Sequence, residues 1–187
     1  DILGERNIIS RTGYTGELGY ELYISVGKAV ELWNFLLKDK RLKPAGLGAR
    51  DTLRLEMAYP LYGQDVDDEH TTYEANYGWV VCLDKGEFTG RSILERQKKE
   101  GVNLKLTGVA LTEGGVPRNG CKILKDGKTI GEFTSATYSP TLKRGIGLGY
   151  LSMPNLKNGE PLEVEIHGRR VKAQVHKTPF HKGTAFK

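Results

Sequence analysis

Turn residues recur regularly in the second half of the chain, and this spacing limits the folds open to it. From Leu104 onward, glycine, proline and other turn signals come roughly every eight to twelve residues, as in antiparallel sandwiches and barrels. Asp126-Gly127 and His167-Gly168 stand between alternating segments and predict tight hairpins. The stretch GIGLG at 145–149 opens no helix, and we interpret it as a strand in which glycine allows close packing. We therefore expect a small antiparallel β-barrel.

The first half of the chain mixes strands with helices. Residues 8–12 and 20–26 flank the stretch GYTGELG, and YELYISV alternates as a strand does. Helical spacing and capping residues predict three helices, and the apolar run NYGWVVCLDKG predicts a short buried strand. The three helices are expected within residues 28–39, 43–60 and 89–100.

Apolar spacing also predicts which residues are buried. Leu47, Leu53 and Met57 form the expected buried stripe of the second helix. Cys82 and Cys121 lie in apolar runs without a CxxC or Cys/His pattern, so we expect buried free thiols in a reducing compartment.

A charged, glycine-containing stretch, KKEGVN, separates the two halves. We expect an α+β fold in which residues 1–99 form the mixed part and residues 104–187 form the β-barrel. The sequence begins with DILGERN, which has no initiator methionine and reads as the middle of a β-segment. This favours a fragment of a longer protein. A recombinant piece whose tag is omitted is the alternative.

Composition excludes several classes of protein. Hydrophobic residues make up 38% and charged residues 27% of the chain, which is typical of globular proteins and not of disordered ones. No apolar run is long enough to cross a membrane. The formal charge of +5 is spread along the chain, and the barrel half has few aromatic residues, so nucleic-acid binding ranks last. We expect a cytoplasmic protein.

The sequence offers no recognisable catalytic or metal site. GLGARD at 46–51 lacks the third glycine of a dinucleotide motif and the GK[ST] ending of a phosphate loop. No serine sits in a GxSxG motif. The four histidines share no ligand spacing, and we expect them to be isolated and exposed. They are His70, His167, His176 and His181.

Tyr14, Glu21 and Arg50 form the constellation of most interest. Glu21 lies on an alternating strand, and Arg50 lies near a helix start, where its guanidinium can reach a carboxylate or a ligand. Tyr14, beside glycines, offers a flat face for a heterocycle. A solvated hairpin with a surface ion pair is the alternative, and spacing alone leaves both interpretations open.

Three long runs, taken together, show a family resemblance. They closely resemble the aminomethyltransferase, or T-protein, family of the glycine cleavage system, over nearly the whole chain. The likeness is to the C-terminal half to two-thirds of that family. The runs are RTGYTGELGYEL, AGLGARDTLRLEMAYPLYGQDVDDEHTTYEANYGWVVCLDKGEFTGR and SATYSPTLKRGIGLGYL.

The resemblance implies a fold, a reaction and its partners. The first part of the chain would be the C-terminal part of a folate-binding aminomethyltransferase domain, followed by the barrel. In the implied reaction, N5 of tetrahydrofolate attacks an aminomethyl group carried on the lipoyl arm of a carrier, the H-protein. Methylenetetrahydrofolate, ammonia and the dihydrolipoyl carrier are released.

The resemblance also implies site residues. Tyr14, Glu21 and Arg50 match the positions expected to contact folate, and Trp79 is a weaker candidate for the same pocket. A carboxylate can accept two hydrogen bonds from the aminopyrimidinone edge of a pterin. Arg91, Lys143 and Arg144 are candidates to meet the glutamate tail of folate or an acidic carrier, and a solvated surface position is the default alternative.

Two departures from the family pattern limit what is carried over. The aspartate that the family uses to orient or activate folate lies upstream of this sequence, so no catalytic residue is assigned, and the fragment alone is expected to be inactive. The tail TPFHKGTAFK matches the family only through Pro179-Phe180.

Two related functions stay open as alternatives. One is a folate-binding assembly or regulatory protein of the same fold, although such proteins centre on a cysteine motif where this chain has RTGYTGELG. The other is the folate domain of a flavin-linked dimethylglycine or sarcosine dehydrogenase, which a flavin-binding GxGxxG far upstream would favour.

Overall fold

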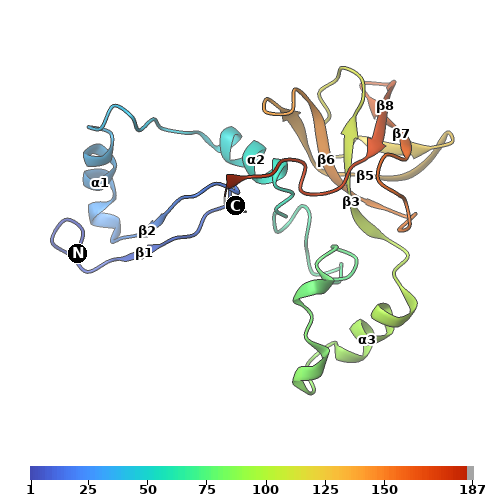
Figure 1. Cartoon of the computed structure of the whole chain (residues 1–187), viewed down its shortest axis with the longest axis horizontal. Coiled ribbons are helices and arrows are strands. Elements are labelled where there is room, and N and C mark those ends of the chain that lie inside the picture. The colour runs from blue at the N-terminus through green and yellow to red at the C-terminus, as the bar shows by residue number, and fades with distance from the viewer. Residues whose placement is uncertain (185–187) are drawn as a thin grey trace. The chain divides into compact units, whose positions relative to one another are not determined.

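The computed structural model describes residues 1–184, which divide into two units (Figure 1). Unit 1 comprises residues 1–54 and the tail from Lys182, and unit 2 comprises residues 55–181. The last three residues of the tail TPFHKGTAFK lie outside the described residues.

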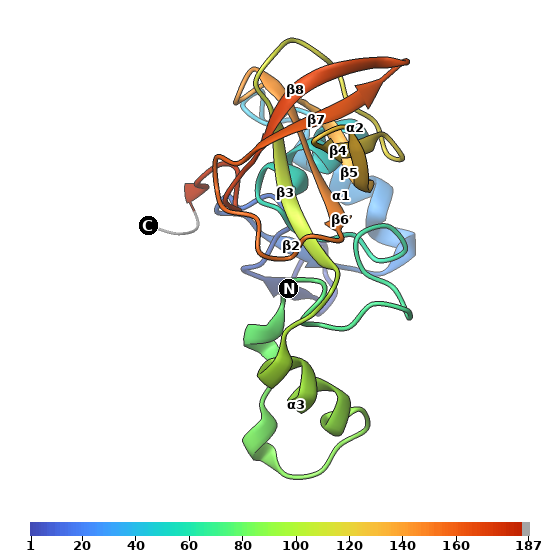
Figure 2. The ribbon, with the colours of Figure 1, turned by 90° about the vertical axis from the view of Figure 1, so that its right-hand side faces the viewer.

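Unit 2 contains a closed antiparallel barrel, as the turn spacing predicts (Figures 1 and 2). Each strand pairs with two others in the order β3-β6-β5-β4-β7-β8, and β8 closes the barrel against β3. The α+β class with a small antiparallel barrel is therefore confirmed. The strands are β3 (Lys105–Leu111), β4 (Lys122–Lys125), β5 (Lys128–Ser139), β6 (Arg144–Leu151), β7 (Pro161–Ile166) and β8 (Arg169–Val175).

Both predicted tight hairpins are present. Asp126 and Gly127, between β4 and β5, have φ values of 50° and 76°. His167 and Gly168, between β7 and β8, have φ values of 50° and 74°. Positive φ at both central residues is what a type I′ turn requires, and its twist matches that of the strands it joins.

The glycines of β6 face the barrel interior. Gly145, Gly147 and Gly149 alternate with Ile146 and Leu148, which belong to an outer apolar cluster. A Cβ atom at Gly147 would lie 2.5 Å from Cδ1 of Phe133, and one at Gly149 would lie 2.3 Å from the carbonyl oxygen of Glu132. The close packing predicted for GIGLG is confirmed.

The two faces of the barrel wall bury separate apolar clusters. Successive residues of β3 show the alternation, because Val109 and Leu111 belong to the interior cluster and Ala110 belongs to the outer one. Phe133 fills the interior, whereas Leu55 and Phe180 cover the outer face. The barrel thus needs the segments before and after it to cover its outer surface.

A buried carboxylate holds the segment before the barrel against the barrel wall. Asp65 is fully buried and accepts hydrogen bonds from the hydroxyls of Thr134 and Ser135 and from the N–H of Leu61 (2.9 Å). The pairing of β5 with β6 shifts register between Phe133 and Ser135, so Thr134 lies at an irregularity that redirects its side chain. The Tyr150 hydroxyl donates to the backbone carbonyl of Asp65 at 2.9 Å.

The expectation of four isolated, exposed histidines was wrong for His70, His176 and His181, which are half-buried. The His70 ring stacks on Tyr150 with 3.9 Å between centroids, and its Nδ1 lies 2.8 Å from a carboxylate oxygen of Asp67. This contact with His70 is the main cause that lowers the pKa of the Asp67 carboxyl. The pair therefore joins the same anchored segment to β6.

The expected strand at NYGWVVCLDKG is absent, and this prediction was wrong. The described backbone instead makes two short 3-10 turns, η2 (Gly78–Val80) and η3 (Leu83–Lys85), followed by α3 (Arg91–Glu100). The N–H of Val80 bonds locally to the carbonyl of Tyr77, so the apolar run has no strand partner to bury it. Cys82 is exposed and Cys121 only half-buried, so the expectation of two buried thiols was also wrong.

Unit 1 contains the predicted hairpin and two helices. β1 (Ile8–Ser10) pairs antiparallel with β2 (Glu21–Tyr23), followed by the 3-10 turn η1 (Val26–Lys28), α1 (Ala29–Leu36) and α2 (Leu47–Glu56), whose last two residues belong to unit 2. The expected stripe on α2 is only partly correct, because Met57 is buried but Leu47 is 83% exposed. The helix end buries Arg54, Leu55 and Glu56 instead.

Within the described residues, no helix is both long and apolar enough to span a membrane.

Replacing Gly147 by alanine tests the packing of β6. We expect Gly147→Ala to lower the free energy of unfolding by about 1–3 kcal/mol, because the new methyl group overlaps the Phe133 ring. Urea denaturation measures the change. Gly114→Ala is the matched control, since nothing lies within 4 Å of its added Cβ. Equal stability of the two variants would contradict this packing.

The raised pKa of the Tyr150 phenol predicts that the protein loses stability at alkaline pH. Burial, reinforced by Asp67, Asp65 and Glu74, raises the pKa of its phenol above the usual range. Because the folded state disfavours the phenolate, the free energy of unfolding is undiminished at neutral pH and falls as pH rises past about 10, where the unfolded phenol ionises.

The variant Tyr150→Phe separates this effect from other titrations. It should lose about 1 kcal/mol at neutral pH with its hydrogen bond, and its stability should then decline less steeply above about pH 10 than that of the parent. Urea midpoints across this range measure both effects. Parallel pH profiles for parent and variant would rule out the role of Tyr150.

Candidate functional site

The candidate site begins in the loop between β1 and β2. This loop carries Tyr14 and three glycines at 13, 16 and 19, and it leads into Glu21, the first residue of β2, which pairs with Ser10. Gly16 has a φ of 71°, a left-handed conformation that glycine adopts without strain. The hairpin therefore presents an aromatic ring and a carboxylate close together in sequence.

The structure brings Tyr14 and Arg50 into contact. The guanidinium carbon of Arg50, on the first turns of α2, lies 4.7 Å from the centroid of the Tyr14 ring. This is the geometry of a cation–π interaction, which orients a planar group with several N–H donors beside an aromatic face. Two of the three residues predicted for the site are thus neighbours, although 36 positions separate 14 from 50.

Glu21 is exposed, and the hydroxyl of Thr12 donates a hydrogen bond to its carboxylate. The carboxylate has room for further donors, because each of its oxygens can accept more than one hydrogen bond. Unit 1 therefore carries a stacking surface, a cation and an acceptor. Their convergence on one ligand stays a prediction.

The other predicted contact residues lie in unit 2. Trp79 follows the start of η2 and is 80% exposed. Arg91 lies 3.3 Å from Glu87, which precedes α3, and 3.4 Å from Glu95, one turn further along α3. These contacts occupy the Arg91 guanidinium with local carboxylates.

Lys143 and Arg144 line a hollow of about 460 Å³ at one end of the barrel, together with Glu113 and Tyr138. Lys143 has a φ of 54° in the turn before β6. Lys143 is exposed and Arg144 is half-buried, and their contact with an anionic group stays a prediction.

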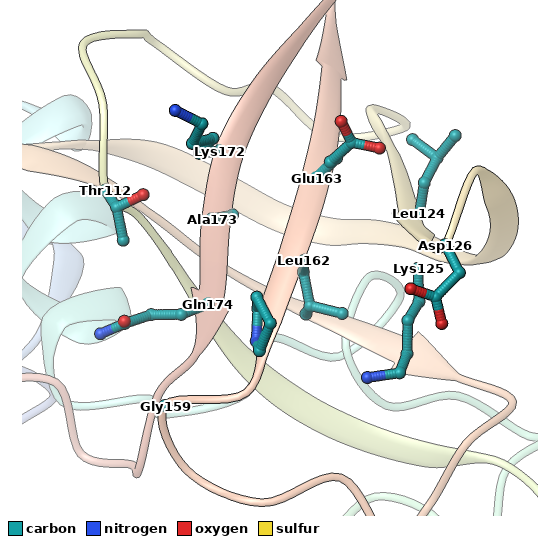
Figure 3. A pocket seen from close by; sticks show the side chains of 11 residues that line it. Thr112, Leu124, Lys125, Asp126, Gly159, Leu162, Glu163, Lys172, Ala173 and Gln174 are labelled. Atoms are coloured by element: carbon teal, nitrogen blue, oxygen red, sulfur yellow. The ribbon is translucent and has the colours of Figure 1, made fainter.

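A second hollow, of about 490 Å³, lies beside β4, β7 and β8 (Figure 3). The charged side chains around it largely have partners: Lys125 bonds to Glu160, Lys172 to Glu113 at 2.9 Å, and Glu163 lies 3.5 Å from Arg170. We therefore assign no ligand to this hollow.

Sequence reasoning missed the contact between the loop and the C-terminal tail. The hydroxyl of Thr184 donates to the carboxylate of Glu17. Short-range patterns carry no signal for a pair 167 positions apart, so only the folded chain reveals it.

Comparison with known families gives two matches. The GCVT N-terminal domain matches residues 1–85, and the glycine cleavage T-protein C-terminal barrel domain matches residues 105–182. Together the two domain models account for most of the chain, in the order in which its two parts occur.

Individual relatives agree with these matches. The chain is 49% identical to an aminomethyltransferase of Nostoc sp. over 184 residues, covering 98% of this chain and 49% of the relative. It is 48% identical to an aminomethyltransferase of Halothermothrix orenii, covering 95% of this chain and 50% of the relative. The chain thus spans about half the length of the curated relatives it matches.

A solved structure agrees as well. The chain resembles the glycine cleavage system aminomethyltransferase T of Bartonella henselae with a TM-score of 0.87 and 30% identity, over 93% of this chain and 49% of that one. Sequence and structure therefore point to the same family through both parts of the chain. The chain belongs to the glycine cleavage T-protein family.

Proposed function

We propose that this chain supplies the C-terminal portion of an aminomethyltransferase, which transfers a one-carbon unit from an aminomethyl-lipoyl carrier to tetrahydrofolate with release of ammonia. The observation that carries the proposal is the contact of Arg50 with Tyr14 beside the hairpin that bears Glu21. Family membership supports it, because the relatives are aminomethyltransferases. A lipoylated H-protein is the proposed partner.

Each of the three residues has a proposed part in holding the pterin of tetrahydrofolate. The Tyr14 ring covers one face of the pterin, and Glu21 accepts hydrogen bonds from its aminopyrimidinone edge. Arg50 holds the Tyr14 ring in place and donates to an acceptor on the ligand. Trp79 remains a weaker candidate for contact with folate.

The roles of the two domains are also proposed. Residues 1–99 would complete the folate-binding domain, and residues 104–187, the barrel domain, would support it. The basic residues Lys143 and Arg144 would meet an acidic group of the carrier or the glutamate tail of folate. We place the reaction in the cytoplasm, or in the mitochondrial matrix of a eukaryote.

The named relatives favour this proposal over its two alternatives. Among the relatives and structures described above, each is an aminomethyltransferase. A folate-binding assembly protein would bind folate without turnover. A dehydrogenase folate domain would need a flavin domain in the same polypeptide.

Titration with tetrahydrofolate tests the site. Glu21→Ala and Arg50→Ala should each weaken binding by about 10- to 100-fold, since each removes a charge-assisted hydrogen bond worth about 1.5–3 kcal/mol. Anaerobic calorimetry of the full-length protein measures the affinities. Arg41→Ala is the control, because Arg41 is an exposed arginine of unit 1 paired with Asp39. If both site variants bind as tightly as the parent, the assignment is wrong.

The 187-residue chain alone should show no turnover. It lacks the upstream carboxyl group that the family resemblance assigns to folate activation, and general acid or base catalysis typically contributes about 10²- to 10⁴-fold. Release of ammonia from an aminomethyl-loaded H-protein in the presence of tetrahydrofolate is the measurement. Sustained release by the chain on its own would contradict this expectation.

A further inference from the structure

The C-terminal tail lies against the loop that carries Tyr14. Thr184 makes the polar contacts: its hydroxyl and its N–H (3.2 Å) both donate to the carboxylate of Glu17. In return, the N–H of Leu18 donates to the hydroxyl oxygen of Thr184 at 3.4 Å. Tail and loop both belong to unit 1.

Two glycines bring the backbones together at this contact. Gly16 and Gly183 are both buried, and a Cβ atom added at Gly183 would lie 2.0 Å from the carbonyl oxygen of Gly16. The two backbones are so close that Gly183 has no space for a side chain. The atoms in the way belong to the backbone of Gly16, which cannot rotate aside as a side chain can. The tail fits against the loop only because this position is glycine.

The other two glycines of the loop lie in more open surroundings than Gly16. Nothing lies within 4 Å of a Cβ built at Gly13, and one built at Gly19 meets only the carbonyl of Glu17, at 4.0 Å. Fixing the backbone of each residue costs about 1–2 kcal/mol of conformational entropy. The tail therefore restrains the middle of the loop, and Arg50 restrains its start at Tyr14.

We propose that Gly183 and Thr184 are positioning residues for the pterin site: they clamp Gly16 and Glu17, and so hold Tyr14 in the orientation that stacks on the ligand. This inference rests on the proposed function for the role of Tyr14. The clamp itself is a property of the chain and can be tested without any ligand.

Hydrogen–deuterium exchange tests the clamp. In Gly183→Ala, amides of residues 13–19 should exchange about tenfold faster than in the parent, a difference of about 1.4 kcal/mol in local opening. Thr184→Val should act in the same direction, and Thr184→Ser should restore slow exchange because it keeps the hydroxyl. Gly27→Ala is the control, since its added Cβ has nothing within 4 Å. Unchanged exchange in Gly183→Ala would overturn the clamp.

Titration with tetrahydrofolate tests the positioning role in the same variants. Gly183→Ala and Thr184→Val should weaken binding about tenfold and Thr184→Ser should not, while the urea midpoint of the barrel stays that of the parent. Faster exchange with unchanged affinity would overturn the positioning role and leave the proposed function intact. If the parent binds no tetrahydrofolate, the proposed function and the positioning role fail together, whereas the exchange experiment still decides the clamp.

Discussion

The buried carboxylate of Asp65 is the contact on which the organisation of unit 2 depends. A charge removed from water is tolerated only when hydrogen bonds replace its solvation, and here the donors come from β5 and from the segment that carries the carboxylate itself. The Tyr150 hydroxyl adds a bond to the same residue. The segment before the barrel therefore cannot separate from β5 and β6 without leaving several buried polar groups unpaired.

Predictions from sequence succeeded where local chemistry decides the structure. Asp126-Gly127 and His167-Gly168 predict hairpins because few other dipeptides accept positive φ at both positions, and the β6 glycines reveal their inward face by alternating with apolar residues. Predictions failed where tertiary partners decide. The run around Trp79 is apolar enough for a strand but lacks one to pair with, and Leu47 has helical spacing without a surface to cover it.

The same distinction applies to the candidate site. The glycines, the aromatic ring and the acid of the hairpin are visible in one short stretch, and the family resemblance connects them with Arg50. Spacing could not reveal that Arg50 stacks on Tyr14, or that Thr184 reaches Glu17. Such contacts join segments far apart in sequence, and their energies depend on backbone positions that no local pattern encodes.

The inward-facing glycines of β6 determine how the interior of the barrel is filled. Barrels of about eight strands are just wide enough to be filled by side chains or to hold one small ligand, and this one has six strands, one of which has bare backbone along most of its inner face. Phe133 and its neighbours occupy the space that the glycines leave. In the described structure, the centre of the barrel is therefore packed with side chains, and close strand contact rather than an open channel shapes it.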